Sequence, residues 1–326
     1  MSRHDLTDVE WNAIRHFLPS QSARKRGRPW IDHRIVINGI LWILHTGSPW
    51  RDLPDEFGCW QTVYNRFRRW VNEDLWDRIY AKLLKRVDEL GEIDRSLWCA
   101  DGSVIRAHRA AAGMLTQSEE NDELNALGRS RGGYSTKLHL LTDGEGTMLA
   151  CTATPGQRHD STEFECLMEN CVLPLQRIAK RPAAIAGDKG YSSNAIRESI
   201  RSRGIEPVIA SKSNETRDEN FDKEKYRRRN IVERVIGWLK ESRRVATRFD
   251  KLTSSYLAFV QLAAMRRLIK THLRDSVQLG PSALKMAIAK ASSTQRAFSV
   301  WGTVPCIDRT WFRCNREPYR TRGRKK

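Results

Sequence analysis

Apolar side chains recur every three or four residues in four successive segments of the first 90 residues. The segments that this spacing predicts as helices are 5–18, 32–46, 60–71 and 75–90. Pro19 ends the first of them, and Gly47 with Pro49 ends the second, because neither residue type continues a helix readily. The pattern therefore predicts a small all-helical domain over residues 1–90, with a polar, basic linker at 20–29.

After residue 91, short apolar runs alternate with helical spacing. The runs predict strands at 97–100, 137–141, 147–154, 183–186 and 207–210. Helical spacing returns at 161–180 with an interruption near Pro174, at 193–203, at 224–244 and at 254–273. Residues 106–135, which are rich in Ala, Gly, Ser and charge, are typical of a loop. Strands mixed with helices predict an α/β domain over residues 91–275.

The net charge of the chain indicates which class of partner it binds. Its 326 residues include 57 Lys and Arg against 39 Asp and Glu, a formal net charge of +18. A soluble protein with this excess is expected to bind a polyanion, most commonly nucleic acid. A membrane surface is the alternative, but the longest apolar run, 35–44, is too short to span a bilayer. We therefore expect a nucleic-acid partner and no membrane.

The excess of Lys and Arg over Asp and Glu is unevenly distributed along the chain. Residues 276–326 hold eleven Lys and Arg against two Asp and Glu, and residues 221–251 hold eleven against five. Residues 91–220 are slightly acidic, with sixteen against nineteen. This distribution is typical of a site that holds cations, flanked by surfaces that hold polyanions. The chain also begins without the apolar stretch of a signal peptide, and its seven cysteines form no CxxC pair. We therefore expect reduced thiols and a cytoplasmic location.

Two aspartates share one local context. Asp101 and Asp188 each follow a short apolar run and precede a glycine turn. A buried strand that ends on Asp projects a carboxylate at the rim of a sheet, where α/β proteins place their sites. Either aspartate alone is explained more simply as a turn residue. A third carboxylate, Glu233, makes a joint site the better interpretation.

Glu233 lies in the segment predicted as a helix over 224–244. On one continuous helix it shares a face about 60° wide with Tyr226, Arg229 and Lys240. A single Glu on a basic helix is usually a solvated ion-pair partner. Here the neighbouring Tyr, Arg and Lys side chains suit both a metal held by carboxylates and a phosphate. The stripe therefore predicts a functional face.

Three carboxylates without a His or Cys cluster suit a hard cation such as Mg²⁺. Two such ions stabilise the attacking and leaving oxygens of a phosphoryl displacement, and Mn²⁺ is a possible substitute. The central histidines, His108, His139 and His159, have no metal-ligand spacing, and the pair His159-Asp160 suits a place near the site or a turn equally well. The sequence contains neither a P-loop nor a G-x-S-x-G motif.

The spacing Tyr226-x2-Arg229-x3-Glu233-x6-Lys240 matches the Y-(2)-R-(3)-E-(6)-K signature of DDE transposases from bacterial insertion sequences. The chain is most similar to the group named after insertion sequence five. The other segments that resemble motifs of this family, including those of both aspartates, are 49–54, 60–67, 100–103, 128–133, 136–139, 155–160 and 187–191. The resemblance covers about residues 5–275, and the motifs follow one another in the family's order.

The resemblance implies a ribonuclease-H-like α/β catalytic domain, a mixed five-stranded sheet with helices, over residues 91–275. It implies that three residues are catalytic and bind two Mg²⁺ ions: Asp101, Asp188 and Glu233. It implies that three accessory residues contact substrate DNA: Tyr226, Arg229 and Lys240. The implied reaction is attack of water on DNA at the element's ends, followed by attack of the freed 3′-OH on target DNA. The implied partners are double-stranded DNA, as terminal inverted repeats and target, and a second copy of the chain at synapsis.

Two basic features of the first 90 residues are candidates for DNA contact. The predicted helices 32–46 and 60–71 resemble a helix-turn-helix, with the second helix offered to the groove through Arg66, Arg68 and Arg69. The alternative is a solvated basic face. The linker resembles a minor-groove hook through Arg24, Lys25, Arg26 and Arg28, although a plain basic linker explains it as well.

Residues 276–326 resemble nothing in the family. They suit either a phosphate-binding arm or an extension without a selected role, and they would bind DNA non-specifically in both cases. The leading hypothesis is an insertion-sequence transposase, cytoplasmic and associated with the nucleoid when bound to DNA. The alternative is a domesticated or inactive family member that binds DNA in a sequence-specific way without transposing it. A third reading is a stand-alone nuclease of the same fold.

Overall fold

The structure is a computed structural model, and it describes residues 4–20, 31–112, 125–130, 132–173, 180–215 and 221–273. The four basic residues predicted as a minor-groove hook (Arg24, Lys25, Arg26 and Arg28) and the tail 276–326 lie outside the described residues. Within these ranges, no helix combines the length and the apolar character that crossing a membrane requires.

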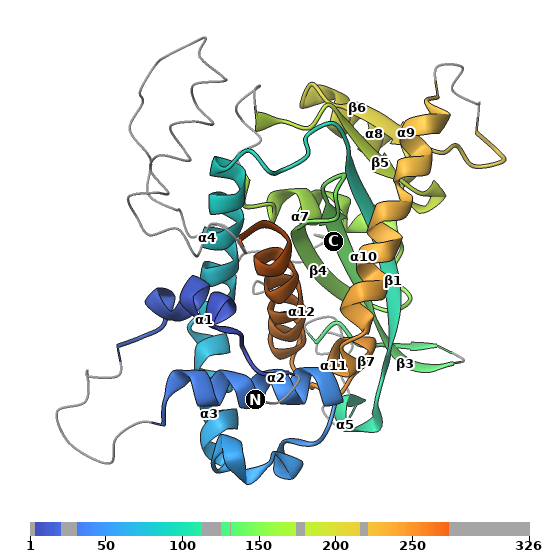
Figure 1. Cartoon of the computed structure of the whole chain (residues 1–326). Helices are drawn as coiled ribbons and strands as arrows, with labels where there is room; N and C mark the ends of the chain where they lie inside the picture. Colours follow the sequence, from blue (N-terminus) through green and yellow to red (C-terminus); the bar gives the residue numbers. More distant parts are fainter. Residues whose placement is uncertain are drawn as a thin grey trace, which may run out of the picture.

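All four helices predicted in the first 90 residues are confirmed (Figure 1). They are α1 (Asp8–Ile14, extended by a 3₁₀ turn at Arg15–Phe17), α2 (His33–Thr46), α3 (Trp60–Asn72) and α4 (Leu75–Glu89). Thr7 caps α1 by accepting a hydrogen bond from the Glu10 N–H, and the Glu10 side chain accepts one from Thr7 in return. Gly47 ends α2 at a φ of 68°, a conformation that glycine adopts without strain. These local sequences therefore determine the helix ends.

The connection between α2 and α3 is longer than the resemblance to a helix-turn-helix implies. It spans residues 47–59 and contains two 3₁₀ turns, Trp50–Asp52 and Asp55–Phe57. A DNA-binding helix-turn-helix joins its helices by a turn of about three or four residues. The pair α2 and α3 is therefore built differently from that motif, although both helices are present.

Within the described residues, seven strands form one mixed sheet, which lies on the side of α12 away from the N-terminal helices (Figure 1). Its strands are β1 (Trp98–Ala107), β2 (Gly128–Ser130), β3 (Gly133–Thr142), β4 (Met148–Pro155), β5 (Ala184–Gly187), β6 (Glu206–Ile209) and β7 (Thr247–Arg248). The order is β2-β3-β1-β5-β6, with β4 on β3 and β7 on β1. Strands β1, β3 and β4 are antiparallel neighbours, whereas β5 and β6 run parallel to β1. This is the ribonuclease-H-like arrangement, and the five predicted strands are its main members.

Two parts of the sheet differ from the sequence prediction. Strand β1 does not end at residue 100 but continues to Ala107, because its second half pairs with β3 from Asp101 opposite Leu140 to Arg106 opposite Ser135. Strand β2 and the start of β3 lie in the segment 106–135, which was predicted to be a loop. Tertiary pairing outweighs the weak local preference of both segments.

The helices that follow the sheet strands are shorter than predicted in two places. The described helices and turns are α5 (Arg109–Ala112), a 3₁₀ turn at Asp160–Thr162, α7 (Phe164–Glu169), a 3₁₀ turn at Lys189–Tyr191, α8 (Asn194–Ser202), α9 (Lys223–Arg228), α10 (Asn230–Lys240), α11 (Arg243–Ala246), α12 (Thr253–Leu268) and a π turn at Ile269–Leu273. Helix α7 covers only part of the predicted helix 161–180, of which 174–179 lie outside the described residues.

The predicted single helix 224–244 is wrong, since it is divided into α9, α10 and α11. The first division falls at Arg229, whose N–H bonds to the Tyr226 carbonyl at 3.1 Å, while the Val232 N–H bonds to the Arg229 carbonyl at 3.1 Å. Both bonds span three residues instead of four, so the chain tightens there and the helical register shifts. The stripe calculated for one continuous helix is therefore not the real geometry.

Helix α12 packs between the sheet and the N-terminal helices (Figure 1). Its Phe259 ring stacks on Phe67 of α3 with 4.7 Å between ring centroids, and the Tyr80 hydroxyl of α4 donates to the Met148 carbonyl of β4 at 2.6 Å. The buried apolar side chains of both halves form one continuous cluster. A boundary near residue 90 stays a prediction, and the two parts share one core.

Candidate active site

Asp101 and Asp188 lie on neighbouring parallel strands at the middle of the sheet. Asp101 belongs to β1, and Asp188 directly follows β5. Ala100 pairs with Gly187, so both aspartates come one residue after the last paired position of β1 and β5. Parallel strands lie about 4.8 Å apart. The register therefore brings together the two carboxylates that the sequence predicted as a pair.

Backbone N–H groups hold one oxygen of each aspartate. The Gly102 N–H donates to Asp101 Oδ1 at 2.9 Å. The Gly190 N–H donates to Asp188 Oδ1 at 2.8 Å, so that Asp188 caps the 3₁₀ turn that follows it. These bonds orient the carboxylates without adding another charged side chain.

Glu233 reaches the same region from α10 through Arg229. The Arg229 guanidinium lies 3.3 Å from Asp101 Oδ2 with its Nη1 atom, and its Nη2 atom donates to Glu233 Oε1. The side chains of Asp101 and Arg229 are largely buried, whereas that of Glu233 is half exposed. Arg229 stands at the joint between α9 and α10, so the break in the predicted helix places this cation between two carboxylates.

The electrostatics of the site oppose three ionised carboxylates in the absence of a cation. Burial raises the pKa of Asp101 to about 6; the Arg229 charge and the Gly102 N–H counteract this, while the charges of Asp188 and Glu233 add to it. Positive charge at this place therefore stabilises the ionised form of Asp101. In the structure that charge comes from Arg229.

The donor chemistry fits a divalent metal. Carboxylate oxygens are the ligands that Mg²⁺ prefers, and mutual repulsion among them is relieved by a cation. No three Asp, Glu, His or Cys side chains of the described ranges already converge closely enough to enclose a metal ion. Arg229 forms an ion pair with Asp101 and a hydrogen-bonded ion pair with Glu233, so its guanidinium occupies the space between these two carboxylates. Metal binding would require the guanidinium to leave.

Replacing Arg229 by Gln is therefore expected to tighten Mn²⁺ binding roughly ten-fold, since a competing cation is removed. Titration calorimetry at pH 7.5 measures this, with Arg234→Gln, an exposed arginine of α10, as the matched control. Affinity should fall for the wild type as the pH drops below about 6, because Asp101 then takes up a proton. Weaker binding in the Arg229 variant would show instead that the guanidinium shapes the site.

The other two predicted accessory residues flank the carboxylates. The Lys240 ammonium donates to Ser103 Oγ at 2.8 Å, two residues beyond Asp101 on β1, and partial burial lowers the pKa of Lys240. The Tyr226 ring lies 5.7 Å from the Arg229 guanidinium. Of the three accessory side chains, Arg229 thus contacts the carboxylates directly, whereas Lys240 contacts Ser103 and Tyr226, on a different helix from Glu233, packs against Arg229. Their contacts with DNA stay predictions.

Of the three arginines predicted on α3 to contact DNA, two are engaged inside the protein. Arg66 is buried, and its guanidinium donates to the Ile31 carbonyl at 2.8 Å, so its assignment to DNA is wrong. Arg68 is half-buried and donates to Ser255 Oγ of α12 at 2.6 Å, which also directs it inward. Arg69 is exposed and lies 3.6 Å from Glu73 one turn along the helix. Four successive positions cover a whole helical turn, so only part of this run faces solvent.

A fourth carboxylate, Asp160, lies at the site although the predicted triad did not include it. Sequence reasoning left His159-Asp160 open between a place near the site and a turn. The structure divides the pair: the His159 ring accepts a hydrogen bond from the Ser161 N–H and caps a turn, whereas the Asp160 carboxylate extends to the glycines that follow Asp101 and Asp188. The two glycines in those motifs were the available clue.

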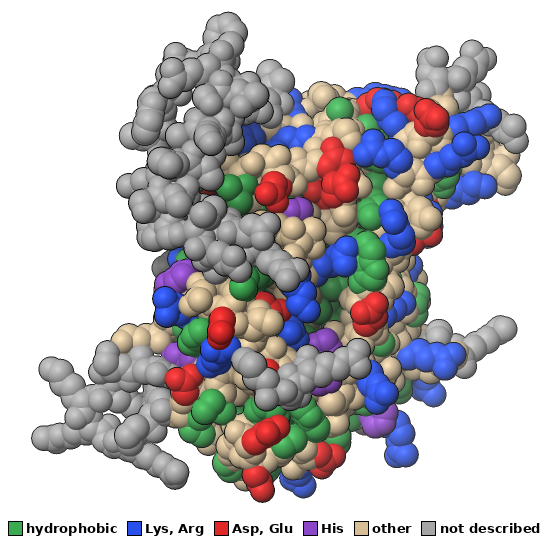
Figure 2. All heavy atoms as spheres, viewed as in Figure 1, with side chains coloured by type: hydrophobic (Ala, Val, Ile, Leu, Met, Phe, Trp, Pro, Cys, Tyr) green, Lys and Arg blue, Asp and Glu red, His purple; other side chains and the backbone are tan. Residues whose placement is uncertain are grey.

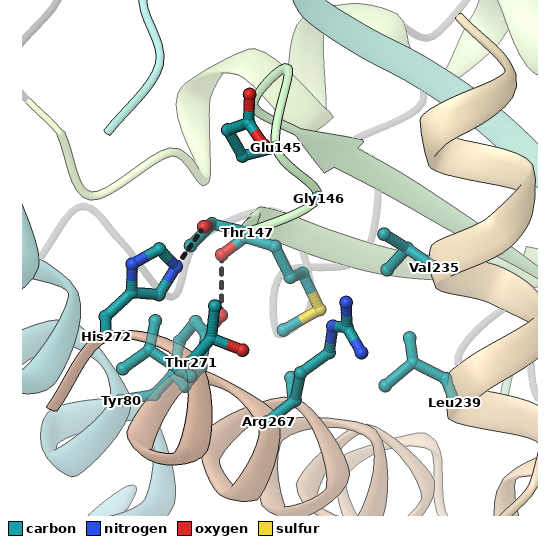
Figure 3. A pocket seen from close by; sticks show the side chains of 12 residues that line it. Tyr80, Glu145, Gly146, Thr147, Val235, Leu239, Arg267, Thr271 and His272 are labelled. Atoms are coloured by element: carbon teal, nitrogen blue, oxygen red, sulfur yellow. Dashed lines mark hydrogen bonds between the residues drawn. The ribbon is translucent and has the colours of Figure 1, made fainter. Parts of the chain in front are cut away.

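A pocket with an empty volume of about 340 Å³ lies between the β3–β4 turn, α10 and the end of α12 (Figure 3). Polar side chains that line it already have partners within the protein. His272 Nε2 lies 3.0 Å from Thr147 Oγ1, and the Arg267 guanidinium stacks 3.3 Å from the centre of the Trp238 ring. Asp101, Asp188 and Glu233 do not line it. The three carboxylates therefore lie outside this pocket.

Lys and Arg side chains gather over α9, the helix that ends at Arg228 directly before Arg229 (Figure 2). This helix contributes Lys223, Lys225, Arg227 and Arg228 within six residues. Arg228 pairs with Asp94 at 3.0 Å, and Lys225 pairs with Glu206 at 2.6 Å. The predicted basic segment 221–251 therefore borders the candidate site in space.

Known families match both parts of the chain. Residues 6–80 match a family described as transposases of the IS4/5 family, and residues 92–268 match the transposase DDE domain. The uncharacterized protein y4sN of Sinorhizobium fredii is 34% identical over 108 residues, which are 33% of this chain and 81% of that protein. An uncharacterized 16.2 kDa protein of insertion element IS402 from Burkholderia cepacia is 37% identical over 112 residues, which are 33% of this chain and 76% of that protein.

The chain is also similar to a third relative and to one solved structure. A Burkholderia cepacia protein described as a transposase for insertion sequence element IS402 is 34% identical over 142 residues, which are 42% of this chain and 64% of that protein. The crystal structure of the Mos1 strand transfer complex matches 68% of this chain and 82% of that chain, with 12% identity and a TM-score of 0.24. A likeness this slight carries no argument about residues.

Proposed function

The chain belongs to the DDE transposases of insertion sequences, and from this premise we propose that it binds the terminal inverted repeats of its element, cleaves DNA there and joins the ends to target DNA. The observation that carries the proposal is the pairing of β1 with β5, which sets Asp101 beside Asp188, together with the contacts of Arg229 with Asp101 and with Glu233. The family implies dependence on a divalent metal. We propose Mg²⁺, with Mn²⁺ as a substitute.

In this proposal Asp101, Asp188 and Glu233 would hold two metal ions, which would stabilise charge on the attacking and leaving oxygens. Arg229, released from Asp101, would turn to a DNA phosphate, since a guanidinium binds two phosphate oxygens well. Lys240 and Tyr226 flank it and would complete the contact with the DNA backbone. The contact of Lys240 with Ser103 and the packing of Arg229 against the Tyr226 ring support this proposal.

The proposed DNA path follows the basic helix α9 beside the carboxylates. Arg69 is the remaining candidate on α3, and the linker and tail are proposed as additional phosphate contacts outside the described residues. Joining two element ends requires that two copies of the chain meet at synapsis. Lys and Arg contacts of this kind make binding strongly dependent on salt.

The test is cleavage of a duplex that carries the inverted repeat flanking the reading frame, in Mg²⁺. We expect strand breaks at the repeat boundary that leave a 3′-OH, followed by joined products when target DNA is added. A duplex with a scrambled repeat is the control. Binding of the repeat without any cleavage would favour the domesticated DNA-binding protein, and cleavage that ignores the repeat would favour a nuclease.

A further inference from the structure

Asp160 stands between the two segments that carry the active-site aspartates. It follows β4 and begins a 3₁₀ turn, and its carboxylate is held by Lys137 of β3, whose Nζ lies 3.1 Å from Asp160 Oδ2. Both side chains are largely buried. The other oxygen, Oδ1, faces His139 Nδ1 at 3.4 Å. Two side chains of β3 therefore converge on this carboxylate.

Two glycines make the room that this carboxylate occupies. A Cβ atom at Gly102, next to Asp101, would stand 2.1 Å from Asp160 Oδ1. A Cβ atom at Gly190, two residues after Asp188, would stand 3.3 Å from Asp160 Oδ2 and 2.8 Å from Asp188 Oδ1. Glycine inside a strand is usually unfavourable and marks a close approach by another group. At Gly102, which lies inside β1, the approaching group is Asp160; at Gly190, which lies in the 3₁₀ turn, Asp188 Oδ1 is the nearest atom and Asp160 Oδ2 the next.

The contacts lie on the face of β1 opposite to Asp101. Successive side chains of a strand alternate between faces, so the missing side chain of Gly102 and the side chain of Asp101 point in opposite directions. Gly102 pairs with His139 on β3, which places the His139 ring on the same face as Asp160. Asp160 therefore contacts one face of β1, and Asp101 faces Arg229 on the other face.

Two buried polar atoms near Asp160 indicate a network arranged around the site. His139 is fully buried, its Nε2 atom pairs with Thr154 Oγ1 at 2.8 Å, and its Nδ1 atom, facing Asp160, has no hydrogen bond. The Tyr191 hydroxyl is buried without a partner in the turn that Asp188 caps. Buried polar groups without hydrogen bonds are costly, and they concentrate where a protein places function above stability.

We propose that Asp160 is a positioning residue of the active site: its carboxylate, fixed by Lys137, separates the strand of Asp101 from the turn of Asp188 at the distance that metal binding requires. This inference rests on the proposed function. A direct bond to the metal is less consistent with the geometry, because Asp160 already neutralises Lys137 and contacts β1 from the opposite face. Its action is thus exerted through the two aspartates.

Titration calorimetry with Mn²⁺ on the full chain, below the melting temperature of each variant, tests this role. Asp160→Ala empties the space and should weaken Mn²⁺ binding at least ten-fold, whereas Asp160→Asn keeps the shape and an acceptor for Lys137 and should weaken it less than three-fold. Glu165→Ala, which removes an exposed carboxylate paired with Arg203, should leave the affinity unchanged. Equal losses in the Ala and Asn variants would overturn positioning in favour of direct charge, and unchanged affinity in the Ala variant would overturn it outright.

Gly102→Ala provides a second route if Asp160→Ala does not fold. The new methyl group must displace the Asp160 carboxylate, so Mn²⁺ affinity should fall with Asp160 still present. Adding Asp160→Ala to this variant should cause no further loss, because the two changes remove the same contact. Additive losses would overturn the proposal. Asp188→Asn is the reference: if it binds Mn²⁺ as well as the wild type, the proposed metal site itself is wrong, whatever the Asp160 variants do.

Discussion

Replacing Asp188 by Asn is expected to reduce DNA cleavage and strand transfer by at least about 10³-fold, which corresponds to roughly 4 kcal/mol of transition-state stabilisation. Asn has the same shape and retains an acceptor for the Gly190 N–H, so the turn that Asp188 caps should stay intact. Only the negative charge is lost, and with it the attraction for a divalent cation. Binding to inverted-repeat DNA should remain within about two-fold, since that attraction is made by basic side chains.

Gel analysis of cleaved and joined products, together with a mobility-shift titration, measures both quantities. Asp32→Asn is the matched control, because Asp32 caps α2 in the same way by accepting a hydrogen bond from the Arg34 N–H at 2.6 Å. It should change neither activity. Cleavage by the Asp188 variant at the wild-type rate would remove this carboxylate from the reaction and leave the assignment of the triad without support.

A structural feature of this protein could be predicted from the sequence where the residues that determine it lie close together in the chain. Thr7 with Glu10, and Gly47 at the end of α2, determine helix ends within a few residues, so the N-terminal helices were predictable. The division at Arg229 was not, because it results from two hydrogen bonds that shift by one residue without any Pro or Gly. The same break places Arg229 between Asp101 and Glu233. A helical-wheel calculation on one continuous helix therefore groups side chains that do lie near Arg229, but it does so from a helix geometry that the chain does not have.

The candidate site was likewise predictable only where it depends on local sequence. The apolar runs before Asp101 and Asp188 predict two strand ends, of which only the second is real because β1 continues to Ala107, and the parallel pairing of β1 with β5 sets the two aspartates on neighbouring segments. The place of Asp160 depends on the pairing of Gly102 with His139 and on the return of the chain through β4, which are long-range facts. The prediction that Arg66 contacts DNA was wrong for a related reason. The burial of Arg66 depends on the position of Ile31, before α2, and the composition of α3 does not indicate that position.

Replacing Arg266 by Met is expected to lower the free energy of unfolding by about 3–5 kcal/mol, because it leaves the buried carboxylate of Glu10 without its partner. Arg266 Nε lies 2.9 Å from Glu10 Oε1, and Glu10 is 1% exposed. Urea unfolding followed by circular dichroism measures the change. Lys85→Met is the control, since Lys85 is exposed and lies 3.9 Å from Glu89, and it should cost less than about 1 kcal/mol.

The pH dependence of this deficit identifies its cause. Burial by itself would raise the pKa of Glu10, but the hydrogen bond and charge of Arg266 bring it below the ordinary value of 4.5. A carboxylate with a lowered pKa adds stability that is fully present above 4.5 and is lost as the pH falls through its folded pKa. The wild type and the Arg266 variant should therefore differ most near pH 7 and converge in acid. A deficit that is constant with pH would mean that lost packing is the cause.

The shape of the same unfolding curves tests whether the first 90 residues are an independent domain. Glu10 lies on α1 and Arg266 near the end of α12, so this ion pair joins the two ends of the described chain. Because α12 shares one apolar core with α2, α3 and α4, we expect a single transition for the wild type and for the Arg266 variant. Two separate transitions in the wild type would show that the N-terminal helices unfold alone, and DNA recognition and catalysis would then reside in independent domains.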